Sequence, residues 1–159
     1  MDYIGKHYDR ETYYFDMNLE KLESLPNSNW ICFMIANEPI DKEKKKRLSD
    51  FLMYSIDKDL LEYIGQGDFG GFLHLTMDEI ITDLEINHKH PEIELTTTGD
   101  NDTDLDNGFW ECFGATALPD RADYDKLKIV CTTIDNIDYK ETLKQLIDRF
   151  NGGYLPDDN

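Results

Sequence analysis

The chain has 159 residues, of which 40% are hydrophobic and 12% aromatic, so it can form one domain with a core of its own. Its 34 acidic and 16 basic residues give a net charge of −18, which argues against binding to nucleic acid or to an anionic membrane, because both need clustered Lys and Arg. The same charge is compatible with a cationic protein partner, with DNA mimicry, or with solubility alone.

The cysteines and the N-terminus indicate a cytoplasmic protein. Cys32, Cys112 and Cys131 each stand in an apolar run, which predicts buried free thiols in a reducing compartment. The first residues include acids and lack the apolar region of a signal peptide. No stretch approaches the roughly 18 apolar residues of a membrane span.

The first third of the chain predicts an arm, a central strand and a helix. Residues 1–29 are rich in tyrosine without a clear period, and we expect an aromatic N-terminal arm that covers the domain. Residues 30–36 are continuously apolar, which is typical of a strand buried on both faces. Asp41 suits a helix N-cap, and apolar residues at helical spacing then predict a helix over 42–56.

The next segment predicts a break followed by a second helix. Residues 60–64 suit either a short strand or an extension of the first helix, and the four glycines within 65–71 are expected to interrupt regular structure. The helix should follow Thr76, because Thr76 and Glu79 have the spacing of a capping box. Pro91 prevents its continuation.

Two further strands, over 92–98 and 109–115, are predicted from β-branched and apolar residues. The polar loop over 99–108 joins them, and their closeness in sequence favours an antiparallel pair.

The last part of the chain predicts a loop over 118–125, a strand over 127–133, a helix over about 139–150 and a flexible tail over 154–159. Together these elements predict an α/β or α+β fold. We expect a single domain over 1–159 with one mixed sheet of about four to five strands and about three helices packed on it.

The aspartate-rich loop invites comparison with a calcium-binding EF-hand loop. Positions 1, 3, 5, 7 and 12 of that motif would fall on Asp100, Asp102, Asp104, Asp106 and Glu111. The sharp turn of the motif needs glycine at position 6, where this chain has Leu105, and the flanking segments are predicted as strands. We therefore favour an acidic solvated loop over a formed metal site.

Other candidate sites lack necessary parts. His88 and His90 share a two-residue spacing, but no third zinc ligand accompanies them. Residues 65–70 match the letters G-x-G-x-x-G, yet the expected context of a strand followed at once by a helix is missing, and Asp68 would repel phosphate. We expect no enzymatic activity, no cofactor and no metal.

The charge distribution indicates a protein-binding surface. Residues 81–125 contain 12 acids and two bases, so this segment carries −10 of the net charge of −18. The loops over 99–108 and 118–125 are expected to form one negative rim with aromatic anchors, where rings give affinity and charges give encounter rate. The predicted partner-binding residues are Asp100, Asp102, Asp104, Asp106, Phe109, Trp110, Glu111, Asp120, Asp123 and Tyr124.

Residues 40–52 and 128–150 have the strand–turn–helix style of small bacterial domains. With its size and charge, the chain resembles the immunity proteins of bacterial polymorphic-toxin and contact-dependent growth inhibition systems. The resemblance implies an inhibitor that occludes the active site of a cognate toxin, a basic nuclease-type domain. Two alternatives stay open: a DNA-mimic or phage-type inhibitor of a nucleic-acid-binding enzyme, and a small enzyme or metal-binding protein that uses His88, His90 or Cys112.

Overall fold

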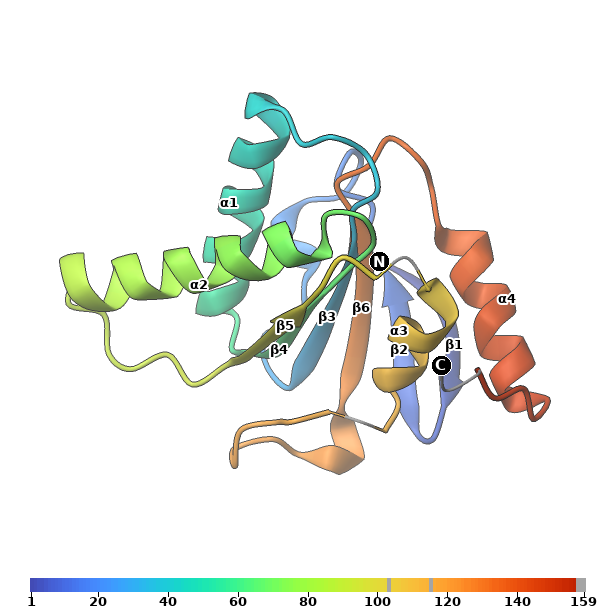
Figure 1. The fold of residues 1–159 in the computed structure, drawn as a ribbon. Helices are drawn as coiled ribbons and strands as arrows, with labels where there is room; N and C mark the ends of the chain where they lie inside the picture. The colour runs from blue at the N-terminus through green and yellow to red at the C-terminus, as the bar shows by residue number, and fades with distance from the viewer. Residues whose placement is uncertain (103, 115, 157–159) are drawn as a thin grey trace.

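The computed structural model describes residues 1–102, 104–114 and 116–156. Within these residues, six strands form one mixed sheet in the order β1-β2-β6-β3-β4-β5, and four α-helices cover it (Figure 1). The predicted α/β class and single mixed sheet are confirmed, and the elements are slightly more numerous than expected. No helix in the described part of the chain is long and apolar enough to span a membrane.

The sheet is built around β3 (Trp30–Ile35), whose six residues are all buried, as predicted for a central strand. β4 (Leu60–Gln66) and β6 (Lys128–Thr133) flank it in parallel, and β5 (Thr96–Gly99) adds a short parallel edge strand to β4. Side chains of β3 alternate between two separate apolar clusters, one on each face of the sheet. Both faces therefore need a covering layer.

Two helices cover each face of the sheet (Figure 1). α1 (Lys42–Asp57) and α2 (Gly70–Asn87) share one apolar cluster with β3, and α3 (Leu105–Glu111) and α4 (Lys140–Asn151) contribute to the other. The predicted N-cap of α1 is confirmed, because the Asp41 carboxylate accepts a hydrogen bond from the Lys44 N–H at 2.9 Å.

The expected N-terminal arm is instead a hairpin that belongs to the sheet. β1 (Asp2–His7) pairs antiparallel with β2 (Arg10–Tyr14), and β2 pairs parallel with β6. Both residues of the connecting turn have positive φ, as a tight hairpin turn requires. The hydrophobic pattern of the sequence did not predict β2, because two of its three buried residues, Arg10 and Thr12, are polar.

The expected antiparallel strand pair over 92–98 and 109–115 is also wrong. The first segment provides only the short parallel strand β5. Residues 109–114 of the second segment lie in and after helix α3, and residue 115 lies outside the described residues. The Asp104 carboxylate caps α3 by accepting from the Asn107 N–H at 3.3 Å. Phe109, Cys112 and Phe113 have helical spacing, and their side chains are buried against the sheet. The segment is too short for its apolar pattern to distinguish this helix from the predicted strand.

Helix α2 begins at Gly70 and not after Thr76. The Thr76 hydroxyl donates to the Phe72 carbonyl inside the helix, so it is not a cap. Gly70 fits this start because a Cβ there would collide with the backbone oxygen of Asp100. Because Gly70 has no side chain, residues 99–102 can lie directly on the first turn of α2.

The predicted flexible tail is anchored at its first residue. The Tyr154 ring stacks on Phe150, and its hydroxyl donates to the Asp106 carboxylate at 2.7 Å. The last three residues of that prediction, 157–159, lie outside the described residues.

We predict that Gly70→Ala lowers the free energy of unfolding by about 2 kcal/mol, because the added methyl group pushes residues 99–102 off the helix. Gly114→Ala is the matched control, since a Cβ at that position meets nothing within 4 Å. Urea denaturation of both variants measures the difference. Equal stability of the two variants would contradict the proposed close contact.

Candidate functional site

In open α/β sheets, ligands usually bind at the carboxyl ends of the strands where the direction of winding reverses. Here the chain winds from β3 through α1 to β4 and through α2 to β5, and then returns to place β6 on the other side of β3. The reversal therefore lies between β3 and β6. We call this place the switch point.

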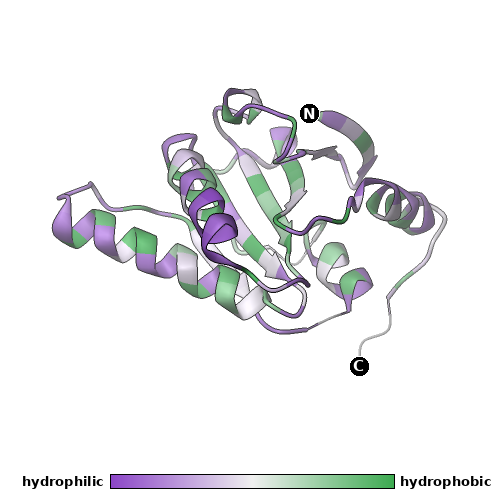
Figure 2. Cartoon of the chain, turned by 90° about the horizontal axis from the view of Figure 1, so that it is seen from above, coloured by the Kyte–Doolittle hydropathy of each residue, from purple (hydrophilic) through white to green (hydrophobic). Residues whose placement is uncertain are grey.

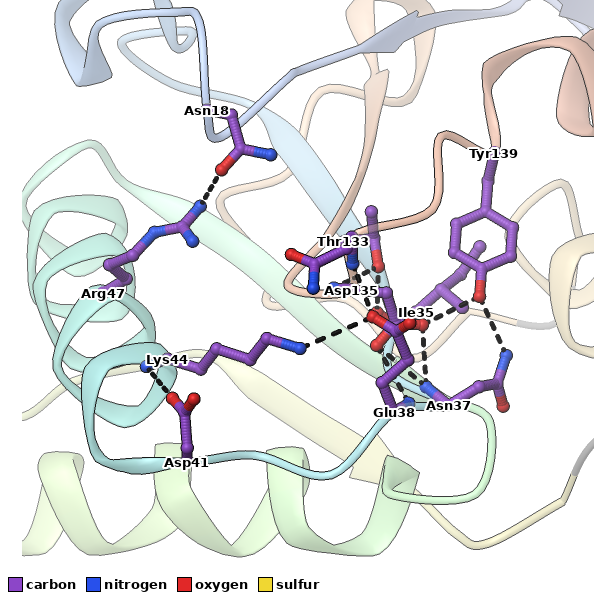
Figure 3. Close-up of polar contacts among 11 residues, drawn as sticks. Asn18, Ile35, Asn37, Glu38, Asp41, Lys44, Arg47, Thr133, Asp135 and Tyr139 are labelled. Atoms are coloured by element: carbon purple, nitrogen blue, oxygen red, sulfur yellow. Dashed lines mark hydrogen bonds and ion pairs between the residues drawn. The ribbon is translucent and has the colours of Figure 1, made fainter.

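A buried carboxylate closes the switch point (Figure 3). Asp135, just after β6, accepts hydrogen bonds from the N–H groups of Asn37 at 2.9 Å and Glu38 at 3.0 Å, and from the Tyr139 hydroxyl at 2.7 Å. Burial raises the pKa of Tyr139 to about 12, so the phenol remains a donor at neutral pH. These bonds tie the loop after β3 to the loop after β6.

Further polar contacts leave little space at the switch point. The Glu38 carboxylate accepts from Lys44 Nζ at 3.4 Å and from the Asn136 N–H at 2.5 Å. The adjacent hollow measures only about 110 Å³ and is bordered by three acids, Asp16, Asp135 and Asp138. This crevice is too small for a nucleotide and its charge is unfavourable to phosphate.

The G-x-G-x-x-G segment does lie between a strand and a helix, contrary to the expected context: β4 ends within it and α2 begins at its last glycine. It nevertheless follows the second strand of the winding, whereas the dinucleotide fingerprint follows the first. Its donors are also occupied, because the Gly67 N–H donates to the Asp102 carbonyl and the Asp68 N–H to the Asn37 side-chain oxygen. The three glycines thus serve close packing: Gly65 lies against the first turn of α2, Gly67 against the Ala36–Asn37 backbone and side chain, and Gly70 against the Asp100 carbonyl.

The predicted aspartates of the loop over 99–108 lie at the carboxyl ends of the strands, which we call the carboxyl edge. The carboxylates of the first three accept hydrogen bonds from backbone N–H groups of the same loop. The Asp100 carboxylate accepts from the Asp102 N–H at 3.0 Å, and the Asp102 carboxylate from the Asp104 N–H at 2.8 Å. Asp104 caps α3, and Asp106 pairs with Arg149 at 3.8 Å. In the part of the chain that the structure describes, no group of three or more His, Cys, Asp or Glu residues is arranged to hold a metal.

The second predicted loop lies at the opposite edge. The Asn29 side chain, just before β3, donates to the Asp123 carbonyl at 2.8 Å and accepts from the Asp123 N–H at the same distance. The loop over 118–125, which contains Asp120, Asp123 and Tyr124, therefore lies at the amino ends of the strands (Figure 1). The expected single negative rim is wrong, because the connection from α3 to β6 carries the chain from one edge of the sheet to the other.

A cleft of about 630 Å³ lies at this amino edge, and we call it the amino-edge cleft. Its charged lining comes from turns that are distant in sequence: five acids and three bases, namely Asp9, Glu11, Asp59, Asp123, Asp125, Arg121, Lys126 and Lys128. Sequence analysis missed the first three of these acids. These acids could be recognised only from their positions near the starts of strands, and those positions can be related to one another only when the strand order of the sheet is known.

Arg121 organises one wall of the cleft. Its guanidinium bonds to the Asp59 carboxylate at 2.7 Å and to the backbone carbonyls of Glu94 at 2.5 Å and Leu60 at 3.2 Å. Most of its donors are therefore used within the protein. The remaining excess of carboxylates suits the cleft to a cationic group of a partner.

The predicted aromatic anchors have different environments. Phe109 is fully buried against Phe33, so it belongs to the core and not to a surface. Trp110 is half-buried beside Tyr8, on the face covered by α3 and α4. Tyr124 is 57% exposed beside the cleft, so it is the predicted aromatic residue that the structure presents there.

A buried acid lies under α3. Glu62 of β4 is 3% exposed, and its Oε2 atom has no hydrogen-bond partner among the residues that the structure describes. Burial is the main reason that the pKa of Glu62 is raised to about 7; the nearby Arg10 lowers it, and the charge of Glu111 adds to the increase. Arg10 itself donates to the Cys112 carbonyl at 2.5 Å and to the Thr116 hydroxyl at 3.1 Å.

Glu111, the remaining predicted surface acid, is exposed at the end of α3. Partial desolvation raises its pKa, and the charges of Asp100 and Asp102 add to this effect. Its carboxylate thus interacts electrostatically with these carboxyl-edge aspartates.

The three cysteines are free and buried, as predicted. Burial raises the pKa of Cys32, Cys112 and Cys131, so these thiols are poor nucleophiles at neutral pH. His88 lies 3.4 Å from Asp83 on the surface, and His90 contacts the Pro91 carbonyl, so neither histidine converges on Cys112.

Comparisons of the chain with protein-family models, with curated proteins and with solved structures find no match.

We predict that Glu62→Gln stabilises the protein at pH 8 by about 1–3 kcal/mol and has little effect at pH 4.5. The folded-state pKa of about 7 exceeds the ordinary value of 4.5, so ionisation of Glu62 costs stability as the pH rises through this window. Urea denaturation at both pH values measures the effect. A variant that is less stable than the natural protein at pH 8 would contradict it.

We also predict that Asp135→Ala lowers the free energy of unfolding by about 2–4 kcal/mol, because three donors lose their acceptor. Tyr139→Phe removes one of these bonds and should cost about 1 kcal/mol. The exposed Asp57→Ala is the control, with an expected change within about 0.5 kcal/mol. If Asp135→Ala behaves like the control, the carboxylate does not hold the switch point together.

Proposed function

We propose that the chain is an acidic protein-binding inhibitor of the immunity-protein kind, which binds a basic toxin domain and covers its active site. The observation that carries this proposal is the amino-edge cleft, where carboxylates from separate turns converge on one solvent-open surface. Lys and Arg side chains of a partner are the groups that such a surface attracts.

The cleft is held in place before any partner arrives. The residues that line it lie in strands of the central sheet or next to them. Hydrogen bonds between Asn29 and Asp123 and between Arg121 and Asp59 hold the loop over 118–126 in place. A preformed surface loses less conformational entropy on binding, which favours tight association.

The charge of the whole molecule supports the same kind of partner. A net charge of −18 steers a cationic protein toward the chain over distances longer than any contact. Exposed Tyr124 offers an aromatic ring beside the carboxylates of the cleft. Rings of this type commonly contribute much of the affinity of a protein interface.

Two features support binding over catalysis. The switch point, where enzymes of this architecture hold substrates, is filled by Asp135 and its partners, and the thiols are buried. DNA mimicry gains less support, since the predicted acidic residues divide between opposite edges of the sheet and form no continuous row.

A tagged pull-down from the source cells at low salt, with a high-salt wash in parallel, identifies the partner. We expect one stoichiometric basic protein that is retained at low salt and weakened at high salt. Absence of any stoichiometric partner at either salt concentration would contradict the proposal.

With that partner, we predict that the double variant Glu11→Lys/Asp125→Lys slows association at least tenfold. Asp57→Lys/Asp148→Lys changes the net charge equally on exposed helix surfaces and should slow it only about twofold. Stopped-flow or surface-based kinetics at low salt compare the two rates. Equal slowing by both variants would show that the cleft is not the contact surface.

A further inference from the structure

Helix α2 exposes two large apolar residues, Leu75 and Ile86, and its outer half packs only partly against the rest of the protein. Figure 1 shows α2 running outward past α1, and Figure 2 shows hydrophobic positions along this projecting part. The buried residues of α2 are Gly70, Leu73 and Met77. From residue 78 onward none is buried, although Ile80, Ile81, Leu84 and Ile86 are all large and aliphatic.

These side chains surround two shallow hollows. The first lies along one face of the helix, where Leu75 is 58% exposed, Ile86 is 71% exposed, and Glu79 and Thr82 lie between them. The eleven-residue separation of Leu75 and Ile86 corresponds to about 16 Å, or three helical turns. The second hollow lies between α2 and α1 and is lined by Met53, Glu79, Ile80, Asp83, Leu84 and His88.

The border of both hollows is acidic. Asp83 and Glu79 line both of them, and Asp78 lines the first. The sequence contains no Lys or Arg between Lys58 and Lys89. Single exposed apolar residues are ordinary, but Leu75 and Ile86 share one helix face with the carboxylates of Asp78, Glu79 and Asp83, and this combination suits a partner that carries both apolar and cationic groups.

We infer that this surface, which we call the α2 face, is a docking site for an amphipathic helix whose apolar stripe is flanked by Lys and Arg. Its length suits about three turns, and the carboxylates of Asp78, Glu79 and Asp83 would pair with the flanking cations. A second copy of this chain is a poor occupant, because it would place the same acids against each other. The α2 face is separate from the amino-edge cleft, so this inference goes beyond the proposed inhibitor function.

The test uses the full chain and a synthetic peptide of about 18 residues made of Leu and Lys, with Leu at helical i, i+3, i+4 and i+7 spacing. A scrambled peptide of identical composition and charge is the comparison. In ¹H–¹⁵N NMR spectra, we expect the amphipathic peptide to shift the amide signals of residues 75–88 and Met53. The scrambled peptide should bind at least tenfold more weakly.

The double variant Leu75→Gln/Ile86→Gln should weaken peptide binding at least tenfold. Leu19→Gln/Leu155→Gln is the matched control, since both leucines are exposed elsewhere, and it should leave binding unchanged. All four substitutions are at exposed positions, and thermal unfolding confirms that the variants remain folded. Equal binding of the scrambled peptide, signal shifts confined to the amino-edge cleft, or self-association of the natural chain in sedimentation velocity would overturn the inference.

Discussion

Complete burial of β3 on both faces is the constraint on which the rest of the structure depends. A strand with parallel neighbours on each side and apolar residues on each face can be stable only between two layers of helices. Those layers are α1 with α2 and α3 with α4. The chain must cross from one side of β3 to the other to build them, and this crossing creates the switch point between β3 and β6.

The switch point is the usual ligand site of this architecture, but the protein fills it with its own groups. Asp135 ties the two loops together, and residues 99–102 occupy the space over the glycine segment where α2 begins. Both arrangements leave the carboxyl edge closed. The amino-edge cleft and the α2 face lie away from these arrangements, and we propose that both bind cationic groups.

The sequence predicted those elements whose stability depends on local pattern. Residues 30–36 and the helix capped by Asp41 were recognisable because apolar runs and capping side chains act over a few residues. The start of α2 was not recognisable, because Gly70 is explained only by its contact with Asp100, thirty residues later. The short helix α3 and the hairpin β1–β2 similarly depend on tertiary contacts and bury polar or mixed residues.

The candidate surface shows the same limit. Charge counting indicated an acidic partner surface, and Asp123 and Tyr124 do lie at the cleft or beside it. Counting could not separate the two loops, since closeness in sequence does not reveal that the chain crosses the sheet between them. It also could not add Asp9 and Asp59, which join the cleft only through strand order.

Hydrogen–deuterium exchange of the chain, alone and with its captured partner, tests most directly whether it acts through the amino edge. We predict slower exchange on binding at residues 8–11, 58–61 and 121–128, and unchanged exchange in the switch-point loops over 36–41 and 133–139. Protection of the switch-point loops without protection of the amino edge would contradict this assignment. It would indicate that the partner contacts the carboxyl ends of the strands.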